Sequence, residues 1–581
     1  MRKFLVLPLT IALLVTITAL AGAAGVSTLV NTGSPTAPFS ENKQNEPSVA
    51  IDANHTNVLA SGANDNIDME ACNAGNDTTC PFTNGVGVSG IYFSFDSGKT
   101  WTQPTYDGLT ARGCQGVPGS SDPACTPVVG PIGTLPWYYE NGLVSDGDPA
   151  VAFGPKPGAN GSFSWANGSR LYYANLTSNL GATRSEEAFK GFEAIAVSRT
   201  DNAAVAATGG AAGKAAWKPP VVISKQSSTT FSDKEQVWAD NASSSAFFGT
   251  VYVCWAAFRG QELSPNAAPA PLQVGVSHDG GDTWSVQQIG AAANNRNRNP
   301  MDGCTIRSDS TGNAYLYGIG RQGNDAFEIQ SISTDGGTSW SKPQPVVGPV
   351  TQPGISDPNT GRPSIDGLAG ARSDLAPAPS VDIANGAPNG TGATNRIVMS
   401  YVSGEITKPH VFFTESTDLG VTWATPRAIE GATDRGYYAA PAISPDGTNI
   451  YVVYNAFTTA YQPTTATPRS LVGVFMQATA TGTAATGAFA EVHRGTAGDP
   501  RGSSQNNLVA EFLGDYVYAA ATRTYGVAVW NDTRVAADCP AIDAWRQDIA
   551  TGGTTVARPA PQQDCAPNFG NSDIFSFTTA P

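Results

Sequence analysis

The sequence is poor in charged residues and in the residues of histidine and zinc chemistry. Only 14% of its 581 residues are charged, four are His, and no CxxC pair occurs among its eight Cys. A zinc site or a histidine-centred catalytic site is therefore not indicated. Acidic residues outnumber basic ones by 48 to 33, for a net charge of −15, which disfavours nucleic acid as a partner.

Long apolar runs are equally scarce, and the one that occurs is N-terminal. The basic start Met1-Arg2-Lys3 precedes an apolar run from Phe4 to Leu20 and the small residues Ala21-Gly22-Ala23. This pattern predicts a signal peptide over residues 1–23, and hence a secreted or periplasmic protein with no membrane span after cleavage. An uncleaved anchor is the alternative, but the run is at the short limit for a bilayer.

The eight cysteines form an even set, which in an exported chain favours disulfides over free thiols. Eight cysteines allow 105 pairings, so connectivity stays open. Neighbour order suggests four pairs: Cys72–Cys80, Cys114–Cys125, Cys254–Cys304 and Cys539–Cys565.

Glycine and proline are abundant, with 63 Gly and 41 Pro, and one turn-like pattern recurs. It reads Ser94-Phe-Asp96-Ser-Gly98-Lys-Thr100-Trp101, and it returns at Ser277 to Trp284, Ser333 to Trp340 and Ser416 to Trp423. Alternating apolar residues precede each copy, which predicts a hairpin turn. The Asp can accept main-chain hydrogen bonds, the Gly supplies a positive φ, and the Trp can bury its ring between neighbouring sheets. We interpret these Asp residues as structural.

The spacing of the copies predicts the architecture. With a degenerate copy at Ser198 to Asp201, four intervals span the 322 residues from Asp96 to Asp418 and average about 80. Seven inner-strand starts share a polar residue followed by an apolar run. They begin at Glu46, Asp148, Glu235, Asp302, Arg362, Tyr438 and Asp515.

Four strands per unit and radial repetition predict an all-β, seven-bladed β-propeller. It would form a single domain over residues 24–581, with a Cys-rich insertion around residues 72–139. The segment from Val26 to Val30 would complete the last blade and close the ring. Six blades of the sialidase type, with a capping extension, are the alternative.

The S-x-D-x-G-x-T-W pattern resembles the Asp-box, or BNR repeat, of secreted sialidase-like propellers, and the resemblance covers the mature chain. Asp233-Lys-Glu-Gln, Gly514-Asp-Tyr and Val529 to Arg534 are similar to phrases of bacterial proteins labelled exo-α-sialidase-like. The resemblance implies an arginine triad, a Tyr–Glu pair as nucleophile and base, and an Asp acid. The Arg-Ile-Pro motif of that family is absent here, and Asn45-Glu46-Pro47 stands in its place.

Because inner-strand starts converge at one end of a propeller channel, they predict a polar ring there. On the resemblance, Tyr438 would be the nucleophile, Glu235 its base, and Asp148 or Asp515 the acid. Clustered carboxylates raise one another's pKa, as a general acid requires. Substrate contacts would come from the following residues: Arg298, Arg362, Arg534, Glu46, Asp302 and Tyr516.

These features indicate an exported glycan-acting propeller, an exo-glycosidase related to sialidases that acts on terminal sugars of a glycan or glycoconjugate. We expect a monomer with no required cofactor. Three alternatives remain open: a non-catalytic propeller that binds carbohydrate or protein, a purely structural ring that caps the inner strands, and a Ca²⁺ ion held by the acids.

Overall fold

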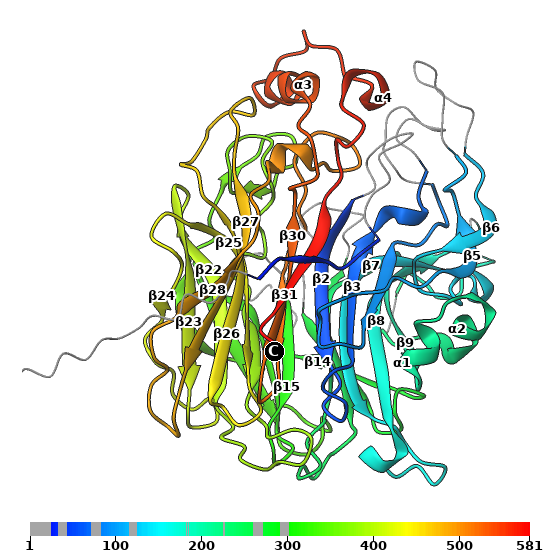
Figure 1. Cartoon of the computed structure of the whole chain (residues 1–581), viewed down its shortest axis with the longest axis vertical. Helices are drawn as coiled ribbons and strands as arrows, with labels where there is room; N and C mark the ends of the chain where they lie inside the picture. Colours follow the sequence, from blue (N-terminus) through cyan, green and yellow to red (C-terminus); the bar gives the residue numbers. More distant parts are fainter. Residues whose placement is uncertain are drawn as a thin grey trace, which may run out of the picture.

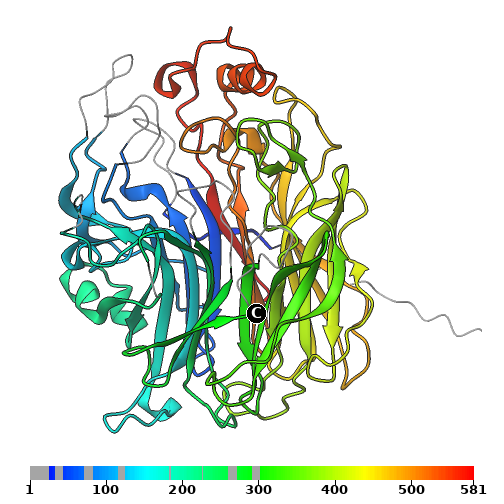
Figure 2. The ribbon, with the colours of Figure 1, turned by 180° about the vertical axis from the view of Figure 1, so that it is seen from behind.

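A computed structural model describes residues 25–32, 43–70, 83–114, 125–181, 183, 185–224, 227–259, 271–290 and 301–581. Within these residues, seven antiparallel sheets stand around one axis as the blades of a β-propeller (Figures 1 and 2). The seven-bladed prediction is confirmed, and the six-bladed alternative is wrong.

In six blades the strands run outward in chain order, and in the last blade they run outward from β29 to β31, with β1 added at the outer edge. Neighbouring inner strands contact each other around the ring. The inner strands are β2 Gln44–Ile51, β7 Leu143–Pro155, β11 Thr230–Ala239, β15 Asp302–Ser308, β21 Ser380–Ile383, β25 Arg435–Ile443 and β29 Tyr518–Ala521. The second strands are β3 Leu59–Asp65, β8 Ser169–Asn179, β12 Val251–Arg259, β16 Ala314–Gln322, β22 Ile397–Glu405, β26 Asn449–Phe457 and β30 Gly526–Asp532.

The third strands are β4 Ser89–Ser94, β9 Ala194–Thr200, β13 Leu272–Ser277, β17 Asp325–Ser333, β23 Lys408–Ser416, β27 Leu471–Thr479 and β31 Asp573–Thr578. The outermost are β10 Trp217–Val222, β14 Ser285–Ile289, β18 Gln344–Val350, β24 Arg427–Ala428, β28 Ala490–Arg494 and β1 Thr28–Leu29. In the first blade an isolated bridge between Phe93 and Thr102 takes the place of the fourth strand.

The ring is closed by the N-terminal strand, as the sequence predicted. β1 pairs antiparallel with β31, so Thr28 lies opposite Ser576 and Leu29 opposite Phe575. Strands from the two ends of the described chain therefore share one blade, which leaves no open seam between the first and last blades.

The recurrent eight-residue pattern forms the turn after the third strand of its blade. In the first copy, Asp96 accepts hydrogen bonds from the Thr100 N–H at 2.9 Å and the Thr100 hydroxyl at 2.7 Å, and the Ser94 hydroxyl donates to it at 2.9 Å. Gly98 has a φ of 82°, which favours glycine. Hydrogen bonds from Thr100 and Ser94 outweigh partial burial and lower the pKa of Asp96. The Asp carboxylate of the pattern therefore stabilises the turn through hydrogen bonds.

The Trp of the pattern joins adjacent blades. Trp340 packs edge-to-face against Tyr252 of the preceding blade, with ring centroids 6.5 Å apart, and Trp423 packs in the same way against Tyr317 at 5.8 Å. The Trp101 indole N–H donates to the Ser576 hydroxyl of the last blade at 2.9 Å. These Trp side chains thus contact the neighbouring blade as predicted, but they are half-buried and not fully buried.

Insertions and disulfides decorate the ring. The sheet of β5 Tyr106–Thr110 and β6 Val128–Ile132 lies beside α1 Ala203–Ala206 and α2 Gly210–Ala216, while α3 Pro540–Ala550 and α4 Pro561–Asp564 gather at one end (Figure 1, top). A short pair, β19 Ile355–Ser356 and β20 Pro363–Ser364, lies in the long connection between β18 and β21.

Three of the four suggested disulfides are present: Cys114–Cys125, Cys254–Cys304 and Cys539–Cys565. The fourth pair, Cys72–Cys80, lies outside the described residues, as does the signal-peptide segment. Disulfides of this kind are compatible with an extracellular protein. In the part of the chain that the structure describes, no helix has the length and apolar character needed to cross a bilayer.

Candidate functional site

A repeated irregularity in the inner strands builds the polar end of the channel. The pairing of the inner strand with its neighbour shifts register between Asn45 and Ser48 in β2, and at corresponding places in β7, β11, β15 and β25. Glu46, Asp148 and Lys234 at these shifts have φ values of 56°, 50° and 63°. Such bulges re-aim side chains, and a positive φ is costly for a residue other than glycine.

Lys234 lies at the centre of this end of the channel. Its ammonium group is 2.7 Å from Asp148 Oδ2, 2.8 Å from Asp515 Oδ2 and 3.4 Å from Asp233 Oδ1. Lys234 is buried, and the charges of these carboxylates outweigh the effect of burial and raise its pKa well above the usual value. One buried cation therefore gathers carboxylates from three blades.

A second cation, Arg372, reaches the ring from the connection between β18 and β21. Its Nε donates to Asp515 Oδ1 at 2.9 Å, and Nη2 contacts the other oxygen of the same carboxylate. Nη2 is also 3.4 Å from Glu46 Oε1. The Tyr438 hydroxyl is 3.1 Å from Asp515 Oδ1 and 3.1 Å from the Arg372 carbonyl oxygen. Asp515 thus links both cations to Tyr438.

The environments of these carboxyl groups separate their pKa values. Burial and the charge of Asp148 raise the pKa of Glu46 well above normal, and Glu46 hydrogen-bonds with Asp148. Burial opposes ionisation of Asp515 also, but Arg372 and Lys234 hold its pKa far below normal. Lys234 does the same for Asp148. The ring thus contains carboxyl groups whose pKa values are displaced in opposite directions, upward for Glu46 and downward for Asp148 and Asp515.

Asp233 is the ring carboxyl with a pKa close to neutrality. Burial raises its pKa to about 7 against the opposing charge of Lys234, while Asp148 and Asp302 raise it further. Its side chain is 17% exposed. Asp233 and Asp515 share the Lys234 ammonium group at 3.4 and 2.8 Å, so the two carboxylate oxygens lie within about 6 Å of each other.

Three further predicted residues line the ring more peripherally. Glu235 is buried, its carboxyl oxygens bond to no other residue in the described chain, and burial raises its pKa well above normal. Burial raises the pKa of Asp302 to about 6. Tyr516 lies with its ring centroid 5.9 Å from the Lys234 ammonium group. Glu235, Tyr438, Asp515 and Tyr516 share a small cavity of about 50 Å³.

The three predicted arginine clamps lie in different places. Arg362 was predicted to start an inner strand, but that prediction is wrong: it directly precedes β20 in the connection between β18 and β21, and the inner strand of this blade is β21. It is 47% exposed and pairs with Asp374 at 2.5 Å, and its charge helps to lower the pKa of Asp515. Arg534 pairs with Asp532 and stacks on Phe575, with 3.8 Å between its guanidinium carbon and the ring centroid, so the structure does not bring it into contact with the ring. Arg298 lies outside the described residues.

Sequence reasoning missed Lys234, Arg372 and Asp233. The pattern of inner-strand starts assigned Glu235 to the channel end, but the bulge places its neighbour Lys234 there as well. The segment Asp233-Lys-Glu-Gln was noted for its resemblance to sialidase-like proteins, so the sequence did contain a signal for Asp233. Arg372 belongs to no repeat, because it lies in a connection rather than in an inner strand.

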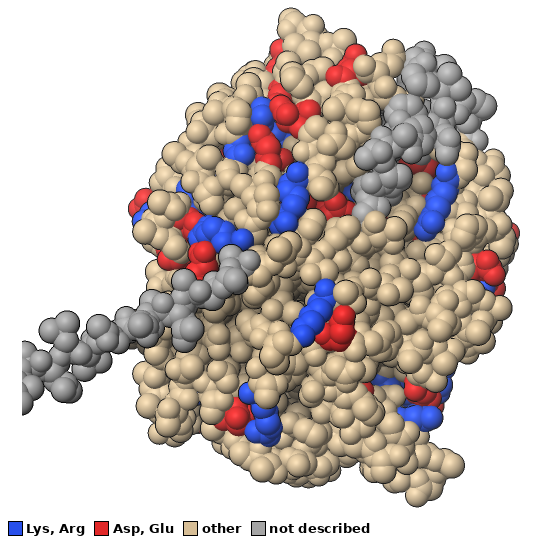
Figure 3. Space-filling view, viewed as in Figure 1, with Lys and Arg blue, Asp and Glu red and all other residues tan. Residues whose placement is uncertain are grey.

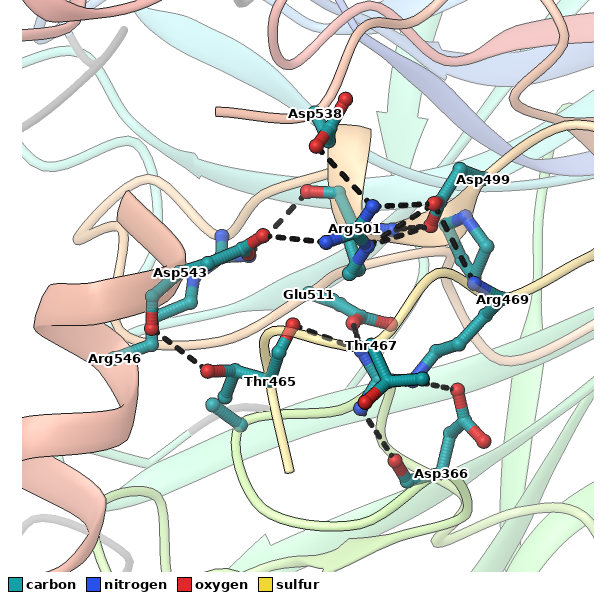
Figure 4. A network of polar contacts seen from close by, with 12 residues as sticks. Asp366, Thr465, Thr467, Arg469, Asp499, Arg501, Glu511, Asp538, Asp543 and Arg546 are labelled. Atoms are coloured by element: carbon teal, nitrogen blue, oxygen red, sulfur yellow. Dashed lines mark hydrogen bonds and ion pairs between the residues drawn. The ribbon is translucent and has the colours of Figure 1, made fainter. Parts of the chain in front are cut away.

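A buried charge network supports the two segments that carry Arg372 and Asp515 (Figure 4). Arg469 contacts Asp366 and is 3.0 Å from Glu511 Oε1, and the Glu511 N–H donates to the Ala369 carbonyl at 2.9 Å. Arg501 joins the same region to Asp543 of α3 at 2.8 Å. Anchoring both segments in this way fixes the position of the Asp515–Arg372 pair.

The site contains no evident metal cage in the described residues, where no three His, Cys, Asp or Glu side chains are arranged to hold an ion. The Lys234 ammonium group occupies the position at which a metal cation would otherwise bind these carboxylates. On the outer face drawn in Figure 3, charged side chains form small groups of both signs.

No protein-family model matches this sequence, and no curated protein does. Solved structures resemble it distantly. A sialidase from Trypanosoma rangeli bound to the inhibitor DANA is 12% identical, covering 76% of this chain and 59% of its own, with a TM-score of 0.37. A Burkholderia pseudomallei lectin is 12% identical over 85% of this chain and 94% of its own, with a TM-score of 0.40.

An α-L-arabinofuranosidase from Fusarium graminearum is 11% identical over 96% of this chain and 98% of its own, with a TM-score of 0.37. None of these likenesses assigns an activity to the present chain.

Proposed function

We propose that this protein is an exported exo-glycosidase that hydrolyses terminal sugars at the polar end of its channel. The observation that carries the proposal is the pairing of Asp233, whose pKa lies near neutrality, with ionised Asp515 within about 6 Å. Glycosidases use one protonated and one ionised carboxyl group flanking the scissile bond. Environments that separate two pKa values assign the acid and base roles.

In this mechanism Asp233 donates a proton to the glycosidic oxygen as its bond to the anomeric carbon breaks. The Tyr438 oxygen forms the new bond to that carbon, and Asp515 accepts the hydroxyl proton. The pKa of Tyr438 is raised mainly by burial, so the free hydroxyl is protonated. Its proton becomes strongly acidic as the new bond forms, and a carboxylate of low pKa can then accept it. A water molecule then attacks the anomeric carbon and gives a proton to Asp233, while the bond to the Tyr438 oxygen breaks and Asp515 returns its proton to that oxygen.

The roles differ from those expected from the sequence. Lys234 and Arg372 keep Asp148 and Asp515 ionised, so Asp233 replaces them as the acid, and Asp515 replaces Glu235 as the partner of Tyr438. Exposed Arg362 is the arginine available to contact a substrate carboxylate or hydroxyl. The substrate is a glycan or glycoconjugate, and the protein acts as a monomer.

A non-catalytic propeller that binds carbohydrate or protein on the same face is the second candidate. The charged groups of the polar ring already neutralise one another, which favours this second candidate. Lys234 has three carboxylate partners, and Asp515 pairs with two cations. In that case Arg362 contacts the bound carbohydrate or protein, and Tyr438 has no role in binding.

The decisive experiment measures turnover of a panel of sialosides and arabinosides. Tyr438→Phe should lower kcat on the order of 10²–10⁴-fold, while Tyr437→Phe should change it little, because the Tyr437 hydroxyl donates to main-chain carbonyls of Arg372 and Gly514. Asp233→Asn should impair alkyl glycosides more than aryl glycosides, whose leaving groups need no proton. Glycan binding without turnover by the wild type would establish the second candidate.

A further inference from the structure

A second cavity, of about 350 Å³, lies at the other end of the channel. On each inner strand its lining residues follow the polar ring residues. On β2 they are Ser48–Ile51, after Glu46, and on β7 they are Val151–Phe153, after Asp148. Since the inner strands run along one axis, the cavity and the polar ring lie at different depths of the same channel. All seven blades contribute to the lining.

The walls of this cavity are mainly apolar. Six blades each supply one large apolar side chain: Ile51, Phe153, Trp238, Ile383, Ile443 and Tyr518. Cavities of about 300–1,000 Å³ with mainly apolar walls and a few placed polar groups are typical of small-molecule sites. The size therefore fits one small molecule with an extended apolar body.

The charged groups of the lining are Arg307, Asp382 and Arg523. Arg307 Nε is 3.5 Å from Asp382 Oδ1, and Asp382 Oδ2 accepts the Ile443 N–H at 2.9 Å. The Arg307 guanidinium carbon stacks on Trp238, 4.8 Å from its ring centroid. The Asp382 charge is thereby balanced inside the cavity wall.

Arg523 is the remaining cation, and it lies on the loop after β29. Its side chain is 37% exposed, and Nη1 is 3.6 Å from Asp446, a residue outside the lining that is itself 26% exposed. Nη2 donates to the Thr391 carbonyl at 2.6 Å. An exposed ion pair of this kind contributes little, so Arg523 can exchange Asp446 for a ligand anion.

We propose that this cavity binds a small amphipathic carboxylate, with its apolar chain along the channel wall and its carboxylate at Arg523. Burying each methylene of such a ligand lowers its dissociation constant about fourfold. The carboxylate gains a charge-assisted hydrogen bond to the guanidinium. This site does not depend on the glycosidase proposal, because it shares no residue with the catalytic groups.

The test is calorimetric titration of the full-length mature protein with octanoate and decanoate below their micellar concentrations. Decanoate should bind about 15-fold more tightly than octanoate, the effect of two methylenes. Decanol and decylamine should bind at least tenfold more weakly than decanoate. Chain-length independence, equal binding of decanol, or no saturable binding would overturn the proposal.

Two substitutions that narrow the cavity provide a structural check. Ala520→Phe and Ala53→Phe each add a ring at a partly buried lining position, and either should weaken decanoate binding at least tenfold. Arg523→Gln should do so while leaving decanol binding unchanged, and Arg534→Gln, which lies outside the lining, is its matched control. Wild-type decanoate affinity in a folded Ala520→Phe or Ala53→Phe variant would overturn the proposal, as would equal losses from Arg523→Gln and Arg534→Gln. If neither phenylalanine variant folds, the chain-length and head-group comparisons decide.

Discussion

The two ends of the channel are built from the same inner strands, yet they differ in chemistry and in backbone. At the polar end, bulged strands carry Glu46, Asp148 and Lys234 at positive φ into a network of buried charges. At the other end, regular pairing places Ile51, Phe153 and other apolar side chains around a cavity of about 350 Å³. The bulges interrupt the alternation of side chains along the inner strands. A charged site and an apolar site can therefore lie only a few residues apart on the same strands.

The largest effect should come from breaking the charge balance of the polar end. Asp515→Asn leaves Lys234 and Arg372 without their shared carboxylate, and breaking one partner of a buried ion pair costs about 3–5 kcal/mol. Denaturant unfolding measures the loss. Ile443→Val in the cavity wall should lower the free energy of unfolding by only about 0.5–1.5 kcal/mol. Equal losses from the two substitutions would contradict the contrast between the polar and apolar ends of the channel.

A smaller effect should appear in the pH dependence of stability. The folded-state pKa values of Asp233 and Asp302 are raised to about 7 and about 6. Between about pH 4 and pH 7 the folded protein therefore binds more protons than the unfolded chain, and stability falls as pH rises. We expect Tm to be about 1–2 °C higher at pH 5.5 than at pH 7.5.

The matched variants for this experiment are Asp233→Asn and Asp302→Asn, each of which should reduce the fall in Tm between these pH values, while other buried carboxyl groups such as Asp240 and Glu511 retain their contribution. Activity should also decline above about pH 7 as Asp233 loses its proton. A Tm that rises steadily from pH 5.5 to 7.5, unaltered by either substitution, would rule out this account.

At the rim of the apolar end, Arg523→Gln should change the free energy of unfolding by less than about 0.5 kcal/mol. Arg523 is partly exposed and 3.6 Å from Asp446, so its ion pair is screened by solvent. Urea unfolding of the two proteins measures the difference. A loss above 1 kcal/mol would show that Arg523 stabilises the fold and is not free to serve a ligand.

The smallest expected effect is that of a chelator. Lys234 neutralises the carboxylates that a Ca²⁺ ion would need, so we expect EDTA to leave Tm unchanged within about 1 °C. Thermal unfolding with EDTA and with added Ca²⁺ measures this. A Ca²⁺-dependent increase in Tm would show that the acids of the polar end hold a metal as well.

Much of the fold could be predicted, because its signals are local or periodic. The turn at Asp96 is closed by hydrogen bonds from residues two to four positions away, and its recurrence set the blade period. Three disulfides follow neighbour order. The site was predicted less completely. Glu46, Asp148, Tyr438 and Asp515 converge as expected, but Arg372 and the inward turn of Lys234 were missed.

The sequence by itself determined the turns, the seven-fold repetition and, with the exception of Arg362, the polar residues near the starts of inner strands, since each depends on neighbours in the chain. The tertiary structure decided which of those residues share a proton or a cation. Asp148 and Asp515 are ionised because Lys234 reaches both from a third blade, and Asp233 titrates near neutrality because burial outweighs the same cation. Desolvation and charge pairing act through space, and only the closed ring brings these groups together.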